Sequence, residues 1–436
     1  MNIAQNIRSK VSNVNPDWYF TVLMAFVFFE YVRPQQSYLS FISIFKFPFM
    51  TLVLLAFIFF KHKKDYIKEE VGYKLFIAFW FLASFTIIFA VNTRATYDVS
   101  VNMAWVGVSF IFPLVIILND TEKLFKFFNI WILSHFLLAL TVIHRGGTGP
   151  GGILGDENDV ACAMAMAVPY VFYLFYFPGI NKKIKIFLLV TGVALVLAVV
   201  VSASRGSMLG LIAAVIMLTY MSKYPFRNSI KIILFVLIFG GFVLSLLSEA
   251  YIADMANMTN PEDSTRDDRL WSWSIAWVMF LHNPIWGVAA GNYPWTNHMY
   301  AELSPMWYEG RHILNGRASH SLYFTLLPEL GIVGTVLYLS VIKVIYSRCR
   351  KIKAIVSQFP SDVTAVKIRL LVSAYQASLV SFLVSSVFIS VLFYPFFWHL
   401  LGLVLVTHKL VKDKYIDELD NNTHTSSREK LILTRK

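Results

Sequence analysis

Long apolar runs, separated by short polar segments, recur along nearly the whole chain of 436 residues. About 20 apolar residues in an α-helix cross a bilayer core of about 30 Å. Within lipid, each backbone polar group needs a partner in its own segment, and the sequence lacks the alternating pattern of barrel strands. The pattern therefore predicts an all-α, polytopic membrane protein with about twelve spans. The predicted spans are residues 18–32, 42–60, 73–91, 101–118, 124–143, 159–177, 184–202, 206–221, 230–248, 320–346, 371–390 and 393–410.

These spans divide the chain into five parts. Residues 1–17 form a cytoplasmic tail without a cleavage pattern, and residues 18–248 carry the first nine spans. Residues 249–319 form one large extracytoplasmic loop, in which we expect helices at the membrane interface. Residues 320–410 carry the last three spans, with Pro395 as the break between the final two. Residues 411–436 are polar and are predicted to be disordered.

The composition agrees with a membrane protein. Hydrophobic residues make up 57% of the chain and charged residues only 15%, compared with about 25% charged residues in typical soluble domains. Of the two cysteines, Cys162 lies in an apolar run and Cys349 in a basic segment that we interpret as a loop. We therefore expect no disulfide between them.

Lysine and arginine are distributed unevenly between alternate loops. When both termini are placed in the cytoplasm, the basic loops KHKKDYIK, NKKIK, SKYPFRNSIK and SRCRKIK all lie on the cytoplasmic side. Cytoplasmic loops of membrane proteins carry this excess of positive charge. The pattern thus predicts the topology, and it explains the net charge of +12 without a nucleic-acid partner.

The basic residues that remain on the outer side are nearly all arginine, with Lys46 as the only lysine. The outer arginines are Arg33, Arg94, Arg145, Arg205, Arg266, Arg269, Arg311 and Arg317. A guanidinium binds phosphate or carboxylate oxygens through paired hydrogen bonds and keeps its charge. The outer face is therefore predicted to bind such ligands. The alternative is that these arginines pair with nearby acids, such as Asp267 and Asp268, or with lipid headgroups.

One helix is predicted inside the large outer loop. The segment Ser264-Thr265-Arg266-Asp267-Asp268 has the capping residues and acids of a helix start. Arg269, Trp273 and Trp277 follow at a spacing of four and share one helix face. Because tryptophan favours the headgroup level, we expect this helix to lie on the membrane with Arg269 at phosphate depth.

Two short outer segments carry candidate chemistry. Arg205 lies in the tight turn 202–207 (SASRGS), where a charge so near the hydrocarbon is costly unless it is compensated. A lipid-linked phosphate would compensate it, and a snorkelling arginine at a capped helix start is the alternative. His320 lies in RASHSLY, where the outer loop re-enters the membrane. At a helix start its pKa should fall, which would keep the imidazole neutral and able to accept a proton. A purely structural histidine is the alternative.

A carboxylate and a polar run complete the candidates. Glu329 lies within a predicted span, where carboxylates are costly and often functional. Nine residues separate it from His320, so it is expected on the opposite helix face, paired with an arginine of another span. The glycines of 146–152 favour a flexible loop, whereas the following run GDEND, with Asp156 and Asn158, is expected to contact a ligand. The sequence shows no metal-binding motif and no phosphate-binding P-loop.

Together these residues resemble the bacterial O-antigen ligase family, whose relatives include O-antigen polymerases and protein O-oligosaccharyltransferases. The segments that carry the resemblance are EYVRPQ (30–35), GDEND (155–159), SRG (204–206), Arg269 with Trp273, HNPIWG (282–287) with Gly291-Asn292, His320-Ser321 and Glu329 with Gly331. EYVRPQ and GDEND are similar to a subgroup found near exopolysaccharide or exosortase loci. Ala289-Ala290 departs from the family's spacing of small residues.

The resemblance implies a GT-C-like membrane fold and a metal-independent glycosyl transfer without a cofactor. An undecaprenyl-pyrophosphate-linked glycan would be the donor, and a hydroxyl of a lipid- or polysaccharide-linked acceptor would receive it at the periplasmic face of the bacterial inner membrane. His320, Arg269 and Arg205 would be catalytic. The residues expected to bind substrate are Arg266, Asp156, Asn158, Arg317, Glu329 and Trp273.

Two other interpretations remain open from the sequence. A polymerase of the same superfamily would use the same donor with another acceptor. A transporter of lipid-linked oligosaccharide would carry charges inside its spans, whereas the arginines here gather at one face. The oligomeric state is not encoded in these patterns.

Overall fold

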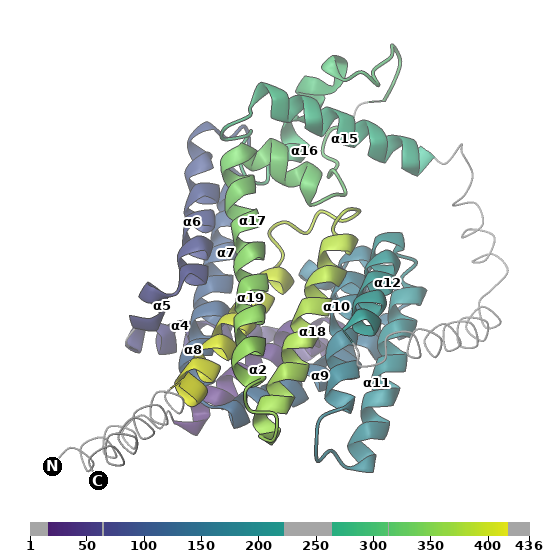
Figure 1. The fold of residues 1–436 in the computed structure, drawn as a ribbon. Helices are drawn as coiled ribbons and strands as arrows, with labels where there is room; N and C mark the ends of the chain where they lie inside the picture. The colour runs from purple at the N-terminus through teal and green to yellow at the C-terminus, as the bar shows by residue number, and fades with distance from the viewer. Residues whose placement is uncertain (1–15, 63–64, 222–263, 313, 417–436) are drawn as a thin grey trace, which may run out of the picture.

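The computed structural model describes residues 16–62, 65–221, 264–312 and 314–416 as a bundle of helices (Figure 1). In this part of the chain every regular element is a helix, so the predicted all-α fold is confirmed. The predicted span 230–248 lies outside the described residues.

The first half of the chain alternates long helices with short helical segments. Its elements are α2 (Asp17–Tyr31), α3 (Pro34–Ser37), η1 (Ser40–Phe45), α4 (Phe47–Lys61), α5 (Asp65–Glu69), α6 (Val71–Phe85), η2 (Thr86–Phe89), α7 (Thr93–Val106), η3 (Gly107–Ile111), α8 (Phe112–Ile117) and α9 (Thr121–His144).

The second half completes the bundle and adds a group of helices beyond one end of it. Its elements are η4 (Gly152–Leu154), α10 (Glu157–Phe175), α11 (Lys182–Val201), α12 (Arg205–Tyr220), α15 (Ser264–His282), α16 (Tyr293–Thr296), η5 (Asn297–Leu303), α17 (Tyr323–Val356), α18 (Val363–Ser385), α19 (Pro395–Val411) and η6 (Lys412–Ile416). Helices α10, α12 and α18 pack against one another. Helices α15 and α16 lie above the bundle in Figure 1.

Eight helical segments of the described residues are long and apolar enough to cross a membrane. They are Ser40–Lys61, Val71–Phe89, Thr93–Ile117, Thr121–His144, Glu157–Phe175, Lys182–Val201, Tyr323–Val356 and Val363–Ser385. Helix α12 is apolar but shorter. A multi-pass membrane protein is therefore confirmed, whereas the predicted number of twelve spans is not.

Several helix boundaries in the structure differ from those predicted from the sequence. Helix α17 begins at Tyr323 rather than at residue 320, so His320 lies in the loop before it. Cys349 is buried in this long helix instead of lying in a loop, although both cysteines are free as expected. Helical structure continues through residues 411–416, which the sequence assigned to a disordered tail, because Tyr415 donates a hydrogen bond to Asp362 at 2.5 Å. The predicted break at Pro395 is confirmed, since α19 begins there.

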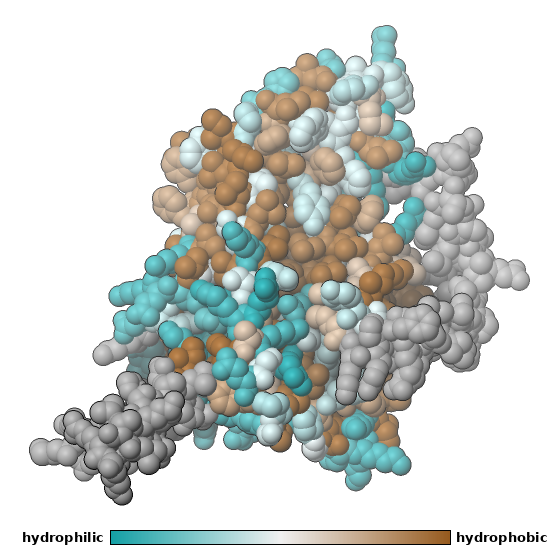
Figure 2. Space-filling model, viewed as in Figure 1, coloured by the Kyte–Doolittle hydropathy of each residue, from teal (hydrophilic) through white to brown (hydrophobic). Residues whose placement is uncertain are grey.

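The end of the bundle away from α15 carries a partly buried ion pair and a group of basic residues. At the end away from α15, Glu70 caps α6 and accepts hydrogen bonds from Arg348 Nη2 at 2.7 Å and Nε at 3.0 Å. Figure 2 shows hydrophilic side chains gathered in the lower part of the view, with hydrophobic side chains over much of the middle and upper part. The end that carries Arg348 and its basic neighbours is the one that the sequence pattern assigns to the cytoplasm.

The topology predicts which side of the membrane each exposed position faces. Because Cys162 and Cys349 are buried, thiol labelling should report only on introduced cysteines. In intact cells with a permeable outer membrane, a membrane-impermeant maleimide should label Glu309→Cys, in the outer loop, but not Ser357→Cys, after α17. Both positions are exposed. Labelling of Ser357→Cys should require disruption of the inner membrane, and the reverse pattern would contradict the topology.

Candidate active site on the outer loop

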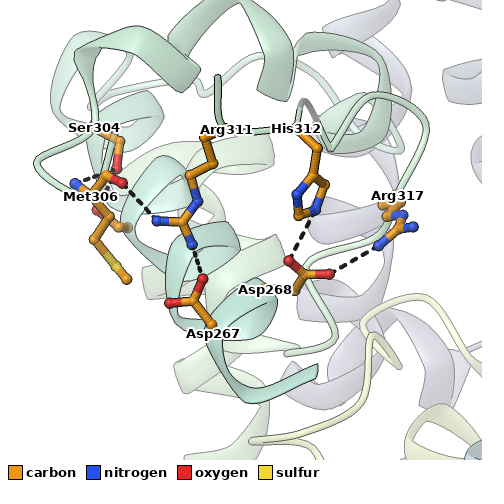
Figure 3. A network of polar contacts seen from close by, with 8 residues as sticks. Asp267, Asp268, Ser304, Met306, Arg311, His312 and Arg317 are labelled. Carbon is orange, nitrogen blue, oxygen red and sulfur yellow. Dashed lines mark hydrogen bonds and ion pairs between the residues drawn. The ribbon is translucent and has the colours of Figure 1, made fainter. Parts of the chain in front are cut away.

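The first turn of α15 is joined by ion pairs to the segment that leads to His320 (Figure 3). Asp268 Oδ1 lies 3.0 Å from His312 Nε2, and its Oδ2 accepts a hydrogen bond from Arg317 Nη1 at 3.1 Å. Asp267 pairs with Arg311. The two acids at the start of α15 therefore also hold the loop that follows this helix. For Arg311 and Arg317, the alternative stated from the sequence is confirmed, because both arginines pair with these nearby acids.

Arg311 fixes the core of the outer loop. Its guanidinium is nearly buried and lies 4.2 Å from the ring centroid of Trp271, a favourable cation–π contact. It also donates a hydrogen bond to the carbonyl of Met306 at 2.7 Å. Trp271 is fully buried, so this outer arginine serves the fold of the loop.

Trp273 connects α15 directly to His320. Its indole Nε1 donates a hydrogen bond at 3.0 Å to the carbonyl of Ser319, the residue before His320. Its ring stacks on Phe324 with centroids 5.0 Å apart. Trp273 is therefore held within the protein, whereas Trp277, on the same helix face, is exposed.

His320 has a backbone conformation that non-glycine residues rarely adopt. Its φ is +52°, in the left-handed region that is disfavoured for a residue with a Cβ atom. The flanking residues hold it there, because Ser319 Oγ is hydrogen bonded to the carbonyl of Ser321 at 2.9 Å and to Thr325 Oγ1 at 2.7 Å. The imidazole is presented from a constrained turn rather than from a helix.

Four of the predicted residues, three arginines and Trp273, converge on one pocket. Arg205 at the start of α12 and Arg266 and Arg269 on α15 line a cavity of about 310 Å³. The other residues around it are Leu209, Leu270, Trp273 and Phe388. Three guanidinium groups beside an apolar wall suit an anion that is attached to a hydrocarbon chain.

The turn that carries Arg205 is held by the polar run at the start of α10. Ser204 caps α12, and its hydroxyl donates a hydrogen bond to Asn158 Oδ1 at 2.8 Å. Ser207 Oγ donates a hydrogen bond to the carbonyl of Asn158 at 3.2 Å. Asp156 caps α10 by accepting a hydrogen bond from the Asn158 amide at 2.8 Å. Asn158 thus positions the turn that carries Arg205. Asp156, two residues before Asn158, is exposed.

The glycine-rich segment is more closely packed than the flexible loop predicted from its composition. Gly147 lies against the backbone of Val201 and Ser202, at the turn before Arg205. At Gly152 a Cβ atom would collide with the guanidinium of Arg33. The glycines are needed because neighbouring groups approach the backbone closely.

Charges of both signs act on His320. Partial burial and the guanidinium of Arg269 lower the pKa of its imidazole, and Arg317 acts in the same direction. Asp156 and Glu157 oppose this by raising the pKa. The lowered pKa agrees with the sequence prediction, but its causes are burial and arginine rather than a helix start.

Glu329 is fixed by backbone amides rather than by the arginine that the sequence suggested. Its Oε2 accepts a hydrogen bond from the Gly291 amide at 2.7 Å, and its Oε1 accepts one from the Tyr293 amide at 2.9 Å. The residue is almost fully buried. This carboxylate attaches the segment after α15 to α17.

That segment lies along a break in α17. Gly331 has φ +58° and ψ −159°, and a Cβ atom there would collide with the carbonyl of Ile285. The amide of Val288 donates a hydrogen bond to the Pro328 carbonyl at 2.8 Å, and the Ile332 amide donates one to the Pro284 carbonyl at 2.8 Å. The glycine and proline positions that carry the family resemblance thus form one interface.

Asn292 anchors the other side of this interface, a role that sequence reasoning missed. Its Oδ1 accepts a hydrogen bond from the Asn92 amide at 2.7 Å, and its Nδ2 donates one to Thr96 Oγ1 at 2.8 Å. Asp159, also missed, accepts a hydrogen bond from Tyr394 at 2.6 Å and is buried. The sequence feature that could have identified Asp159 is the polar GDEND run, of which it is the last residue. Asn292 appears in the sequence analysis only within the segments that carry the family resemblance, without a role of its own.

Ala289, which departs from the family pattern, supplies a stability test. Its φ is +91°, a conformation that costs roughly 1–2 kcal/mol for a residue with a Cβ atom. We predict that Ala289→Gly raises the unfolding temperature in detergent. The matched variant Ala290→Gly, next to it and also buried, should lower stability by about 0.5–1 kcal/mol, because glycine adds backbone entropy to the unfolded chain. Equal effects of both variants would contradict the strain at Ala289.

In the described part of the chain, no group of three or more His, Cys, Asp or Glu side chains is arranged to hold a metal ion.

Comparison with known proteins agrees with the motifs. Residues 187–339 match the family model described as O-antigen ligase, a range that includes Arg205, Arg269, His320 and Glu329 but not the GDEND run. The chain is 23% identical over 260 residues to the teichuronic acid biosynthesis protein TuaE of Bacillus subtilis (strain 168). This match covers 53% of the chain and 52% of TuaE, so the chain spans about half the length of that relative. The predicted resemblance is thus confirmed, because residues 187–339 of this membrane protein match the O-antigen ligase family model.

Proposed function

We propose that the protein is a membrane glycosyltransferase that moves a glycan from an undecaprenyl-pyrophosphate carrier to an acceptor hydroxyl at the periplasmic face of the inner membrane. The observation that carries this proposal is the pocket shared by Arg205, Arg266 and Arg269, together with the electrostatic influence of Arg269 on His320. These observations support an anion-binding group with a proton acceptor close to it.

The arginine pocket accounts for the donor. Arg205 and Arg269 would bind the two phosphates, while Leu209 and Phe388 of the same pocket would contact the prenyl chain. As the bond between the sugar and the phosphate breaks, negative charge grows on the departing lipid diphosphate. Fixed guanidinium groups stabilise that charge in the transition state, so this proposal requires no metal ion.

His320 accounts for the acceptor. The acceptor oxygen forms a bond to the anomeric carbon of the donor sugar, the bond from that carbon to phosphate breaks, and the hydroxyl proton moves to the neutral imidazole. The lowered pKa of His320 favours the neutral form needed for this step. The lipid diphosphate leaves with the bonding electrons.

The remaining candidates act around this centre. Arg266 adds charge to the pocket and Trp273 forms part of its wall. Asp156 and Arg317 would contact substrate near His320, although Arg317 also pairs with Asp268. Asn158 and Glu329, which we expected to bind substrate, support the site here through the Arg205 turn and the α15–α17 interface.

A polymerase of the same superfamily is our second candidate, because the relative TuaE is named for teichuronic acid biosynthesis. Glycan analysis of cells that lack the protein separates the two reactions. A missing ligase leaves complete polymer on the lipid carrier, and a missing polymerase leaves single repeat units. A transporter, the non-enzymatic alternative, would move the lipid-linked glycan without forming a new glycosidic bond.

Substitution of the central residues tests the proposal. His320→Ala should lower kcat by about 10²–10⁴-fold, and Arg205→Ala and Arg269→Ala by about 10²–10³-fold, with membrane insertion unchanged. Arg94→Ala is the matched control, because Arg94 is also an outer arginine but is exposed and pairs with Asp98 at 3.0 Å. Product formation is measured with reconstituted protein in the presence of EDTA. Full activity of the His320 and Arg269 variants would refute the mechanism.

The charges around His320 predict opposite pH shifts for two variants. A proton acceptor works in its neutral form, so kcat/KM falls as the pH drops through the pKa of His320. Arg317→Gln removes a charge that lowers this pKa and should move the acid limb to higher pH. Asp156→Asn removes a charge that raises it and should move the limb to lower pH. Profiles of kcat/KM against pH measure both shifts, and shifts in one common direction would contradict the assignment.

A further inference from the structure

A second pocket lies on the outer side of the bundle, away from the arginine pocket. It has a volume of about 430 Å³ and is formed where α3 and η1 meet the start of α4. Its lining residues are Gln35, Gln36, Ser43, Lys46, Pro48 and Phe49. It includes Gln35 of the EYVRPQ segment, which the proposed transfer reaction does not use.

The chemistry of this pocket suits a phosphorylated headgroup that carries sugar. Lys46 supplies a positive charge and Ser43 a hydroxyl, while Pro48 and Phe49 supply an apolar wall. The Gln35 amide donates a hydrogen bond to the Phe29 carbonyl at 3.5 Å, and Gln36 Oε1 accepts one from Arg33 at 3.4 Å, so each amide keeps further hydrogen-bonding groups for a ligand. The Lys46 ammonium is exposed and has no hydrogen-bond or ion-pair partner among the residues that the structure describes. A cation with neutral polar groups beside it and an apolar wall behind it can bind the phosphate of a lipid headgroup and neighbouring hydroxyls together.

The surroundings place the pocket at a lipid surface. Three hydrophobic side chains of η1 are strongly exposed, with Phe41 at 67%, Ile44 at 82% and Phe45 at 58%. Both η1 and α4 belong to one candidate span, Ser40–Lys61. Exposed apolar groups of this kind mark contact with lipid in a chain of this type. A ligand in the pocket would therefore have its headgroup beside Lys46 and its hydrocarbon chain along η1 and α4.

The backbone at Lys46 is constrained. Its φ is +48°, in the left-handed region that residues with a Cβ atom disfavour, and such conformations gather at functional sites. Lys46 is also the only lysine that the predicted topology leaves on the outer side. Both the predicted topology and the backbone geometry therefore disfavour a lysine at this position, which points to a specific role for its charge.

The pocket is connected to the candidate active site through the glycine-rich loop. Arg33, two residues before Gln35, donates hydrogen bonds to the Gly151 carbonyl at 3.0 Å and to Gln36 Oε1 at 3.4 Å. The loop continues to Asp156, whose charge acts on His320. A glycan that extends from the pocket along this loop would reach His320 past Asp156.

We propose that Gln35, Gln36, Ser43 and Lys46 bind the diphosphate headgroup of a lipid-linked glycan that serves as the acceptor. This inference rests on the proposed function and gives it a substrate class, since both substrates would then be lipid-linked and the reaction would lengthen a glycan on its carrier. The arginine pocket takes the donor, and the Lys46 pocket takes the acceptor.

Native mass spectrometry of the purified full chain with farnesyl diphosphate, a soluble prenyl diphosphate, tests the proposal by counting bound molecules. The wild-type chain should bind two molecules, and Lys46→Ala and Arg269→Ala should each bind one. The double variant should bind none. Lys61→Ala is the matched control, because it removes an exposed lysine from the other end of α4 and should still bind two.

Three results would overturn the second site. The first is that the wild-type chain binds a single molecule of farnesyl diphosphate and Lys46→Ala still binds it. The second is that phosphatidylglycerol displaces one of two bound molecules. The third is that inorganic pyrophosphate competes as well as farnesyl diphosphate does. Displacement by phosphatidylglycerol would identify a site for bulk phospholipid, and equal competition by pyrophosphate would identify a site for any small anion. If Arg269→Ala retains both molecules while Lys46→Ala loses one, the donor pocket of the proposed function fails and the second site stands. In transfer assays, Lys46→Ala should raise the KM for a lipid-linked acceptor at least fivefold and leave the donor KM unchanged.

Discussion

The buried carboxylate of Glu329 is the constraint on which the outer part of the molecule depends. By accepting hydrogen bonds from the Gly291 and Tyr293 amides, it attaches the segment after α15 to the broken part of α17. A buried charge is stable only when such donors satisfy it. Because α15 precedes that segment and His320 precedes α17, this attachment fixes the helix that carries Arg269 relative to the turn that carries the histidine.

Six of the eight outer arginines fall into two groups with different surroundings. Arg33, Arg311 and Arg317 hold loops together through hydrogen bonds and ion pairs within the protein. Arg205, Arg266 and Arg269 instead line a pocket with apolar walls. The bias toward arginine on the outer side therefore reflects both structure and chemistry. A guanidinium serves either purpose, because its planar donors match a carboxylate, a carbonyl or a phosphate.

The all-α membrane fold could be predicted from the sequence, because length and hydropathy are local properties that lipid imposes on each helix. The start of α17 could not, because the residues after His320 are apolar enough to resemble a span, and the turn depends on contacts of Ser319 with Trp273 and Thr325. The partners of Glu329 could not be predicted either. Its position in an apolar run suggested an arginine of another span, but its partners are backbone amides of the segment after α15, beside the break in the helix at Gly331.

The candidate site was predictable in its residue types but not in its pairings. Asp268 lies 49 residues from Arg317 in the sequence, and no local pattern indicates that they meet. The same applies to the link between Ser204 and Asn158, 46 residues apart. Such contacts arise from the packing of whole helices. The motifs identified which side chains matter, and the fold determined which of them lie together.

The central claim is that one lipid diphosphate lies between Arg205 and Arg269 beside His320. A cryo-electron microscopy structure of the protein in lipid nanodiscs with a bound undecaprenyl diphosphate examines this directly. We expect phosphate density in contact with both guanidinium groups and an open space for an acceptor hydroxyl next to the imidazole. Phosphate density elsewhere, with Arg205, Arg269 and His320 facing separate surroundings, would contradict it.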